Sequence, residues 1–262
     1  MTDKFKNHES LPVIQSLWIG EKLSVMEQLC ITSFLSNRHP FHLYTYGDVK
    51  NVPEGVVLKD ASNIIPRDKI FKNKDRDIYA GFSDFFRYKL LFEKGNYWCD
   101  MDVVCLRPFE KRSDYVFANS KILKSAGNVN ETSGVASCVI KVPPESEIMN
   151  YCYEVSKNKN PQELEWGDIG PRLLRIAVKK FNFEKYVTRV ETFCPVDWSH
   201  WQRFLSRSPL VIWTEMAKMA LFRTKGVHLW NEMWRLDGVD KNAVFPESCI
   251  YEQLKRRYLG AS

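Results

Sequence analysis

Two patterns of apolar residues alternate along the first sixty positions of the chain. A β-rich apolar run at 13–19 predicts a strand. Ser24 is a candidate helix cap, and apolar side chains then recur at helical spacing until Asn37, which predicts a helix between them. Alternation at 41–46 and a short apolar run at 56–58 predict two more strands. This order of elements favours an α/β sheet built from the N-terminus.

The rest of the chain continues the same mixture. A polar stretch at 66–78 predicts a surface loop, and the aromatic-rich segment 79–94 predicts a helix with Gly95 as its left-handed cap. The run 97–106 predicts one strand. Later elements are predicted as strands at 115–119, 134–142 and 226–230, helices at 145–157, 171–181 and 248–258, and an irregular aromatic-rich segment at about 193–215.

Composition narrows the class of protein. The chain has 262 residues, of which 44% are hydrophobic and 27% charged, so one folded domain is expected rather than a disordered chain. The net charge of +6 and pI of 8.8 favour anionic partners such as nucleotides but fall short of a nucleic-acid-binding domain. The polar N-terminus lacks the apolar core of a secretory signal, and seven cysteines without a C-x-x-C pair favour free thiols. We therefore expect a cytoplasmic protein.

Several common catalytic motifs are absent from the sequence. It contains no G-x-G for a dinucleotide, no G-x-x-x-x-G-K phosphate loop, no G-x-S-x-G elbow and no H-E-x-x-H zinc motif. Nicotinamide enzymes, ATP motors, α/β-hydrolases and zinc proteases are therefore disfavoured.

One pair of aspartates stands out by its surroundings. Asp100 and Asp102 lie inside the apolar run Y-W-C-D-M-D-V-V-C-L, whereas Asp75 and Asp77 lie in a solvated charge run. The period of a strand would place Asp100 and Asp102 on one face. Two buried like charges are costly unless a cation joins them, and Mg²⁺ or Mn²⁺ takes such carboxylates. The alternative is an exposed strand end that points both acids at water.

The helix predicted before this pair carries two charged residues on an otherwise apolar, aromatic surface. Asp84 and Arg87 lie at i and i+3 and so share one helix face. We expect this face to front the metal site, with Arg87 meeting phosphate and Asp84 accepting protons from hydroxyl groups. The alternative is an intrahelical ion pair worth only tenths of a kcal/mol, by the usual ~0.3–0.5 kcal/mol of exposed pairs.

Here the residues carry a family resemblance. F-S-D-F-F-R-Y-K-L-L-F-E-K-G-N-Y-W-C-D-M-D resembles the core of the retaining glycosyltransferases with a D-x-D motif, which include α-1,4-galactosyltransferases, α-1,6-mannosyltransferases, bacterial capsule and lipopolysaccharide transferases, and glucosylating toxins. Asn96 replaces the second glycine of the family pattern, and Trp98 replaces a tyrosine. Asn tolerates positive φ, so the turn can survive. The residues that match the pattern are Asp84, Arg87, Tyr88, Gly95, Asp100 and Asp102.

Two further segments resemble the same family. I-Q-S-L-W-I-G resembles its first strand, which implies that Trp18 stacks on the nucleotide base, with a core tryptophan as the alternative. H-L-W-N-E-M-W resembles its C-terminal element, which implies that His228 is a third metal ligand or a diphosphate contact, with a structural histidine as the alternative. Trp230 and Trp234 would close the site. W-G-D-I-G-P resembles an acceptor-side turn in which Asp168 could bind an acceptor hydroxyl.

The resemblance implies a fold and a reaction. The fold is a single α/β domain of GT-A type over 1–262, with a Rossmann-like nucleotide-sugar-binding half at 12–110 and an irregular acceptor-binding half at 111–262. The reaction is the transfer of a hexose, with retention, from a nucleotide-diphospho-sugar, UDP ranked before GDP, to a polysaccharide, lipopolysaccharide or lipid-linked glycan. The implied cofactor is Mn²⁺ or Mg²⁺, with Asp100, Asp102 and His228 as its ligands. The implied catalytic residues are Asp84, Arg87 and Asp102. The residues implied to bind the donor are Trp18, Asp84, Arg87, Asp100, His228 and Trp230.

Alternatives to this function remain open on the sequence alone. One is a toxin-like transferase that modifies a protein, and another is a nucleotide- or carbohydrate-binding module without turnover. A peripheral contact with the inner face of the membrane is also expected from the C-terminal helix. Its aromatic and apolar residues lie beside Lys255, Arg256 and Arg257, although an ordinary helix packed on the domain ranks ahead of membrane docking.

Overall fold

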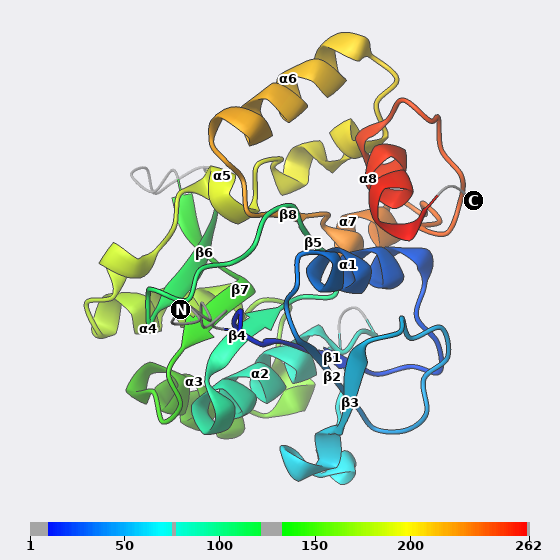
Figure 1. The fold of residues 1–262 in the computed structure, drawn as a ribbon. Coiled ribbons are helices and arrows are strands. Elements are labelled where there is room, and N and C mark those ends of the chain that lie inside the picture. The colour runs from blue at the N-terminus through cyan, green and yellow to red at the C-terminus, as the bar shows by residue number, and fades with distance from the viewer. Residues whose placement is uncertain (1–9, 75–76, 122–132, 261–262) are drawn as a thin grey trace, which may run out of the picture.

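A mostly parallel six-stranded sheet forms the centre of the computed structural model, which describes residues 10–74, 77–121 and 133–260 (Figure 1). The first four strands in the spatial order pair in parallel, and the last two add antiparallel. The prediction of an α/β fold is therefore confirmed. The spatial order is β3 (Val56–Asp60), β2 (Phe41–Thr45), β1 (Ile14–Trp18), β4 (Asn96–Cys99), β7 (Ser133–Val142) and β6 (Val116–Lys121).

Helices cover both faces of this sheet. Successive strand residues point to opposite faces, so Leu17 and Ile14 of β1, three positions apart, face opposite sides of the sheet. Leu17 packs with α2 (Ala80–Lys94), α3 (Glu147–Lys157) and α4 (Pro171–Lys180). Ile14 packs on the side of α1 (Val25–Ser36). The cap of α1 is Ser24, as predicted, and Glu27 completes a capping box with it.

A second, smaller layer joins the N- and C-terminal parts of the chain. Its core is the two-stranded antiparallel sheet of β5 (Val103–Cys105) and β8 (Gly226–His228). Around it lie α5 (Val190–Phe193), α6 (Pro209–Leu221), α7 (Asn231–Leu236) and α8 (Ile250–Leu259), and a 3₁₀ segment at Trp198–Leu205. Further 3₁₀ turns lie at Ala61–Asn63, Arg67–Lys69, Pro161–Glu163 and Glu184–Tyr186.

The turn between α2 and β4 forms as its sequence predicts. Gly95 has φ +59° and Asn96 has φ +68°, so the Asn that replaces glycine adopts the left-handed conformation that Asn tolerates. Gly95 is required for a second reason, since an added Cβ would lie 2.5 Å from the backbone nitrogen of Pro144. The seven cysteines are all free, as predicted, and all of them are buried.

Two of the predictions for the C-terminal part need correction. The segment 193–215, expected to be irregular, contains the last residue of α5, the whole 3₁₀ segment and the first half of α6. The sequence of α6 is apolar on nearly every side, which hides the amphipathic period on which helix prediction depends.

The second correction concerns the C-terminal helix. Tyr251, Leu254 and Tyr258 of α8 are buried against the domain, next to α1 and the 3₁₀ segment. The apolar side of α8 is therefore not available to a membrane, and the alternative of an ordinary packed helix holds. In the part of the chain that the structure describes, no helix combines the length and apolarity needed to cross a bilayer.

Candidate active site

The candidate site lies where the strand order of the central sheet reverses. Strands β2 and β3 lie on one side of β1, whereas β4 returns to its other side, and β1 and β4 run in parallel. Trp18 ends β1, and Asp100 directly follows β4, so both lie at the carboxyl edge of neighbouring strands. In open α/β sheets this switch point is where ligands bind.

Asp100 and Asp102 do not lie on one continuous strand. The expected strand 97–106 divides into β4 and β5, and the two aspartates occupy the turn between them. The reason is that β4 belongs to the six-stranded sheet, whereas β5 pairs with β8 in the other sheet, so the chain must change direction at 100–102. The backbone N–H of Val103 donates to the carbonyl of Asp100 at 3.2 Å and closes the turn. The two carboxylates therefore converge through a turn.

His228 completes the group from the other side. It ends β8 opposite Val103, and its Nε2 lies 3.2 Å from Oδ2 of Asp102. The same oxygen accepts the backbone N–H of Asn231 at 2.8 Å. Burial alone would raise the pKa of Asp102, but the His228 charge and these hydrogen bonds outweigh it and lower the pKa. Conversely, Asp102 raises the pKa of His228 against the effect of burial.

Arg87 links α2 to this turn. Its side chain is 5% exposed, and the guanidinium contacts Oδ1 of Asp100 at 3.1 Å and Oδ1 of Asp84 at 3.2 Å. It also lies over the ring of Trp98, whose indole N–H donates to Oδ1 of Asp100 at 2.8 Å. Because Arg87 is occupied by these protein groups, it holds Asp100 in place. This arrangement does not favour the direct contact between Arg87 and phosphate that the sequence predicted.

A bulge in β7 supplies the remaining anchors. Phe117 pairs with Ile140, but the next residue of β6, Ala118, pairs with Ala136, so residues 137–139 have no partner in β6, although Val139 still pairs with Cys99 of β4. Arg87 Nη1 donates to the carbonyl of residue 137 at 2.6 Å, and the Asp100 N–H donates to the carbonyl of residue 138 at 2.8 Å. The bulge thus frees the carbonyls that position both Arg87 and Asp100.

Asp84 is buried beside Arg87 and beneath the loop that contains Gly170. Burial raises the pKa of Asp84 to about 6, against the lowering effect of Arg87. An added Cβ on Gly170 would lie 2.5 Å from Oδ2 of Asp84, and the Tyr88 hydroxyl donates to the carbonyl of Gly170 at 3.1 Å. Gly170 therefore permits a close approach of this loop to Asp84.

We expect Gly170→Ala to displace Asp84 and to reduce turnover. The added methyl group cannot be accommodated without moving a buried carboxylate, and such overpacking costs about 1–3 kcal/mol of unfolding free energy. Turnover and melting temperature would be measured with Gly47→Ala as the control, since a Cβ on Gly47 meets no atom within 4 Å. Wild-type turnover in Gly170→Ala would show that the contact with Asp84 is unimportant.

The ligand set suits a hard divalent cation. Oxygens of Asp100 and Asp102 and a nitrogen of His228 all lie within 4.8 Å of one another. Burial and the neighbouring Asp102 raise the pKa of Asp100, although Arg87 lowers it. The negative charge of the two aspartates is therefore not fully balanced by the positive groups around them. Carboxylate oxygens with one imidazole are ligands that Mg²⁺ or Mn²⁺ can use. These three residues therefore fit the expected metal.

Trp230 and Trp18 are the two tryptophans that were expected to bind the donor. Trp230 has the left-handed φ of +61°, and its ring lies 3.9 Å from that of His228, centroid to centroid. This strained conformation turns the chain so that the N–H of Asn231 reaches Asp102. Trp18 is half-buried, its Nε1 is buried without a hydrogen-bond partner, and the Lys241 ammonium lies 5.9 Å from its ring.

Two other expected residues have structural roles. Trp234 is 1% exposed, and its indole N–H donates to the carbonyl of Leu229 at 2.8 Å, so it belongs to the core and does not close the site. The carboxylate of Asp168 pairs with Arg172 at 2.7 Å and accepts the N–H of Glu165 at 3.1 Å. Asp168 therefore stabilises its own turn.

Lys241 is a charged neighbour of Asp102 that the sequence did not indicate. Its ammonium pairs with Glu27 at 2.5 Å, lies over Trp18, and helps to lower the pKa of Asp102. It therefore lies between the expected base-stacking residue and the D-x-D turn. A lone lysine in the loop G-V-D-K-N has no sequence signal, because only the packing of α1 brings it here.

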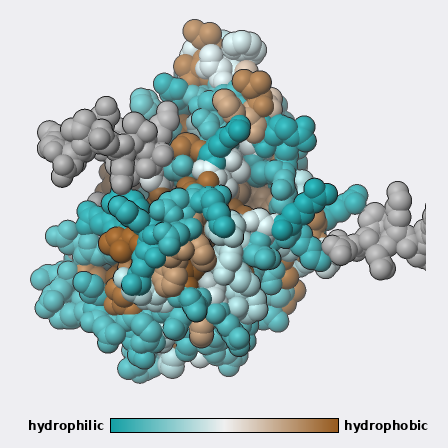
Figure 2. All heavy atoms as spheres, turned by 90° about the vertical axis from the view of Figure 1, so that its left-hand side faces the viewer, coloured by the Kyte–Doolittle hydropathy of each residue, from teal (hydrophilic) through white to brown (hydrophobic). Residues whose placement is uncertain are grey.

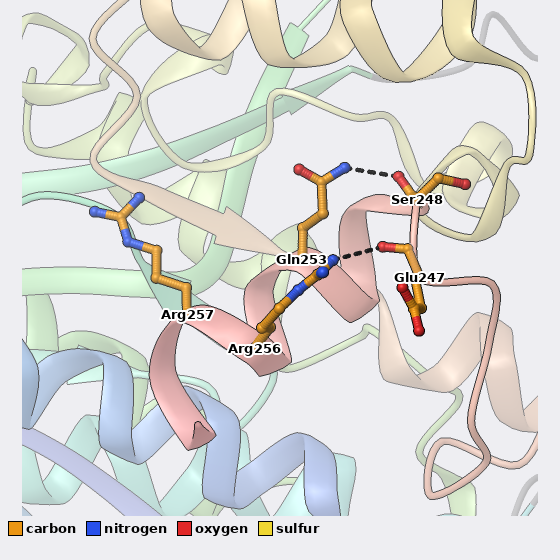
Figure 3. Close-up of a pocket in the computed structure, with 5 residues that line it drawn as sticks. All are labelled: Glu247, Ser248, Gln253, Arg256 and Arg257. Carbon is orange, nitrogen blue, oxygen red and sulfur yellow. Dashed lines mark hydrogen bonds between the residues drawn. The ribbon is translucent and has the colours of Figure 1, made fainter. Parts of the chain in front are cut away.

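A separate hollow of about 370 Å³ lies beside α8 (Figure 3). Arg256 Nη2 donates to the carbonyl of Glu247 at 2.8 Å, and Gln253 Nε2 donates to that of Ser248 at 2.6 Å. No residue of the D-x-D group lines it. Its polar groups bind one another, so we do not assign it to the site.

Two protein families match different parts of the chain. A family described as a glycosyltransferase sugar-binding region containing a DXD motif matches residues 25–123, and one described as an alpha 1,4-glycosyltransferase conserved region matches residues 145–258. The first match includes Asp84, Arg87, Asp100 and Asp102, and the second includes His228. No curated protein matches the chain significantly.

Solved structures with a similar fold also carry glycosyltransferase titles. The PaToxG glycosyltransferase matches with 13% identity and a TM-score of 0.44, over 95% of this chain and 86% of that one. The apo form of the glycosyltransferase GlyE in Streptococcus pneumoniae TIGR4 matches with 9% identity and a TM-score of 0.42, over 95% of this chain and 63% of that one.

Proposed function

We propose that the chain is a glycosyltransferase of the D-x-D type, a metal-dependent retaining enzyme that transfers a hexose from a nucleotide-diphospho-sugar to a glycan, and the two family matches support the glycosyltransferase assignment. The observation that carries this proposal is the convergence of Asp100, Asp102 and His228 at the switch point of the sheet. Two partly buried carboxylates and an imidazole converge there, and a divalent ion would join them.

Each side chain has a role in this proposal. Asp100, Asp102 and His228 would hold Mn²⁺ or Mg²⁺, which when bound stabilises negative charge on a leaving diphosphate. Arg87 orients Asp100, and Asp84, ionised above a pKa of about 6, accepts hydrogen bonds from sugar hydroxyls. Lys241, which pairs with Glu27 beside Trp18, adds to the positive field that lowers the pKa of Asp102.

The donor and acceptor follow from the same layout. Trp18 stacks on the nucleotide base, and we rank a UDP-sugar before a GDP-sugar. The acceptor is a polysaccharide, lipopolysaccharide or lipid-linked glycan that approaches from the loop around Gly170, because this loop covers Asp84. The proposed chemistry is confined to one domain, since the ligands come from both the β4–β5 turn and β8.

A thermal-shift screen tests the proposed donor class. UDP- and GDP-sugars would be added with Mn²⁺ and with a chelator, and we expect a rise in melting temperature that requires both sugar nucleotide and metal. A shift given equally by the chelated samples would contradict metal-assisted donor binding. A metal-dependent shift without any donor turnover would identify a binding module instead of an enzyme.

We expect Trp18→Ala to raise the KM for the donor by about 10- to 100-fold, corresponding to ~1–3 kcal/mol of lost stacking. The reason is that Trp18 is only half-buried and ends β1 at the site. Donor KM and melting temperature would both be measured. A mutant that loses ~3–5 kcal/mol of stability but keeps its KM would assign Trp18 to the core instead.

A further inference from the structure

Helix α6 has apolar residues on both of its faces. Ile212 and Met219 point inward and pack in the core around the 3₁₀ segment Trp198–Leu205. The inward Glu215 is 2% exposed and is neutralised by Arg203 and Lys218. A surface helix is expected to be polar on the side opposite its core face, and α6 is not.

The outward face of α6 instead carries large apolar side chains. Leu210, Trp213 and Leu221 are 69%, 68% and 78% exposed. With Ala217 they recur at i, i+3, i+7 and i+11, which is one side of a helix about 20 Å long. Figure 1 shows α6 projecting from the top of the molecule, and Figure 2 shows hydrophobic atoms at that protruding end. No charged residue lies within this outward stripe.

Basic residues outnumber acidic ones in the segment that contains this stripe. Arg203 and Lys218 pair with Glu215, and Lys225 pairs with Glu110. From Arg203 to Lys225 the chain has five basic residues and one acidic residue, and that acid is the buried Glu215. Arg207 lies just before α6 and Arg223 just after it, and both are exposed. Apolar and tryptophan side chains flanked by exposed cations are the pattern of a helix that lies in the interface of an anionic membrane.

We propose that α6 is a membrane-docking helix, which inserts Leu210, Trp213 and Leu221 into the surface of a bilayer of anionic lipids while Arg207 and Arg223 contact the headgroups. A second copy of the chain fits less well as the partner. Two α6 faces in contact would bring their flanking arginines together, and the stripe carries no exposed acidic residue to pair with these arginines. The further consequence, that the acceptor is lipid-linked, rests on the proposed function, whereas the docking itself does not.

Co-sedimentation with vesicles tests the docking. We expect the full chain to bind vesicles of phosphatidylglycerol and phosphatidylcholine at low salt, to bind phosphatidylcholine alone much less, and to dissociate as salt increases. The variant Leu210→Ser/Trp213→Ser/Leu221→Ser should bind at least about tenfold less, since it removes the apolar area that would be buried. The variant Arg207→Glu/Arg223→Glu should lose the preference for anionic lipid.

The control variant is Leu236→Ser/Val244→Ser, which changes two exposed apolar residues outside α6 and should bind as the wild type does. Failure of the wild-type chain to bind at low salt would overturn the proposal, as would equal binding by the α6 variant or equal loss in the control. Light scattering without lipid gives another contrary result, namely an oligomer that the α6 variant dissociates.

Donor hydrolysis in solution keeps this test separate from the proposed function. The α6 residues are exposed and lie outside the D-x-D group, so the α6 variant should hydrolyse donor as the wild type does. Loss of vesicle binding with intact hydrolysis supports docking. Absence of hydrolysis in the wild type would refute the proposed function whatever the vesicles show.

Discussion

Replacing Asp100 with Asn should reduce turnover by about 100- to 1,000-fold, because the loss of a metal ligand removes several kcal/mol of electrostatic stabilisation. The fold should survive this change. Burial and Asp102 raise the pKa of Asp100, so its charge is unfavourable in the metal-free protein, and Asn can still accept the indole N–H of Trp98. Turnover and the melting temperature without metal are the two measurements.

Asp102→Asn should reduce turnover as much but should also lower the melting temperature. Ionised Asp102 is stabilised by His228 and by the N–H of Asn231, and these interactions weaken in the amide. Asp77→Asn is the control, because Asp77 is exposed and pairs with Lys72 on the surface; Asp75, the other member of this pair of aspartates, lies outside the described residues. Wild-type turnover in both Asp100→Asn and Asp102→Asn, or equal damage from Asp77→Asn, would contradict the assignment of the motif.

Replacing Arg87 with Ala should destabilise the protein by about 3–5 kcal/mol and abolish turnover. The change leaves Asp84 and Asp100 buried without their shared cation. Denaturant unfolding would measure the free energy. The intrahelical alternative predicts only tenths of a kcal/mol, by the usual ~0.3–0.5 kcal/mol of exposed pairs, so the two accounts differ by about tenfold.

Two further variants sharpen this result. Arg87→Lys keeps the charge but cannot span both carboxylates and the bulge carbonyl, so it should recover only part of the stability. Arg172→Ala breaks the more exposed pair with Asp168 and should cost no more than about 1 kcal/mol. An Arg87→Ala protein as stable as Arg172→Ala would mean that Arg87 does not hold the site together.

Local sequence was sufficient wherever local physics decides the structure. The cap at Ser24, the left-handed pair Gly95 and Asn96, and the start of α2 at Ala80 all depend on neighbours within a few residues. Asp84 and Arg87 share a face because helical spacing alone requires it. These elements and the α/β class could therefore be predicted without the structure.

Features that depend on distant contacts could not be predicted in this way. The break at 100–102 exists because β5 pairs with β8, more than one hundred residues later. The β7 bulge that anchors Arg87 arises from the register of β6 against β7. Helix α6 gives a misleading signal because its outer face is as apolar as its inner face. The break and the bulge are both decided by strands that lie far along the chain.

The central claim is that Asp100, Asp102 and His228 bind a divalent ion that activates a nucleotide-diphospho-sugar. The most direct test is release of nucleoside diphosphate from UDP-sugars, with Mn²⁺ and with a chelator, by the wild type and by Asp100→Asn. We expect release by the wild type with Mn²⁺, and none above background after chelation or from Asp100→Asn. Release that persists equally under chelation and in Asp100→Asn would contradict the claim.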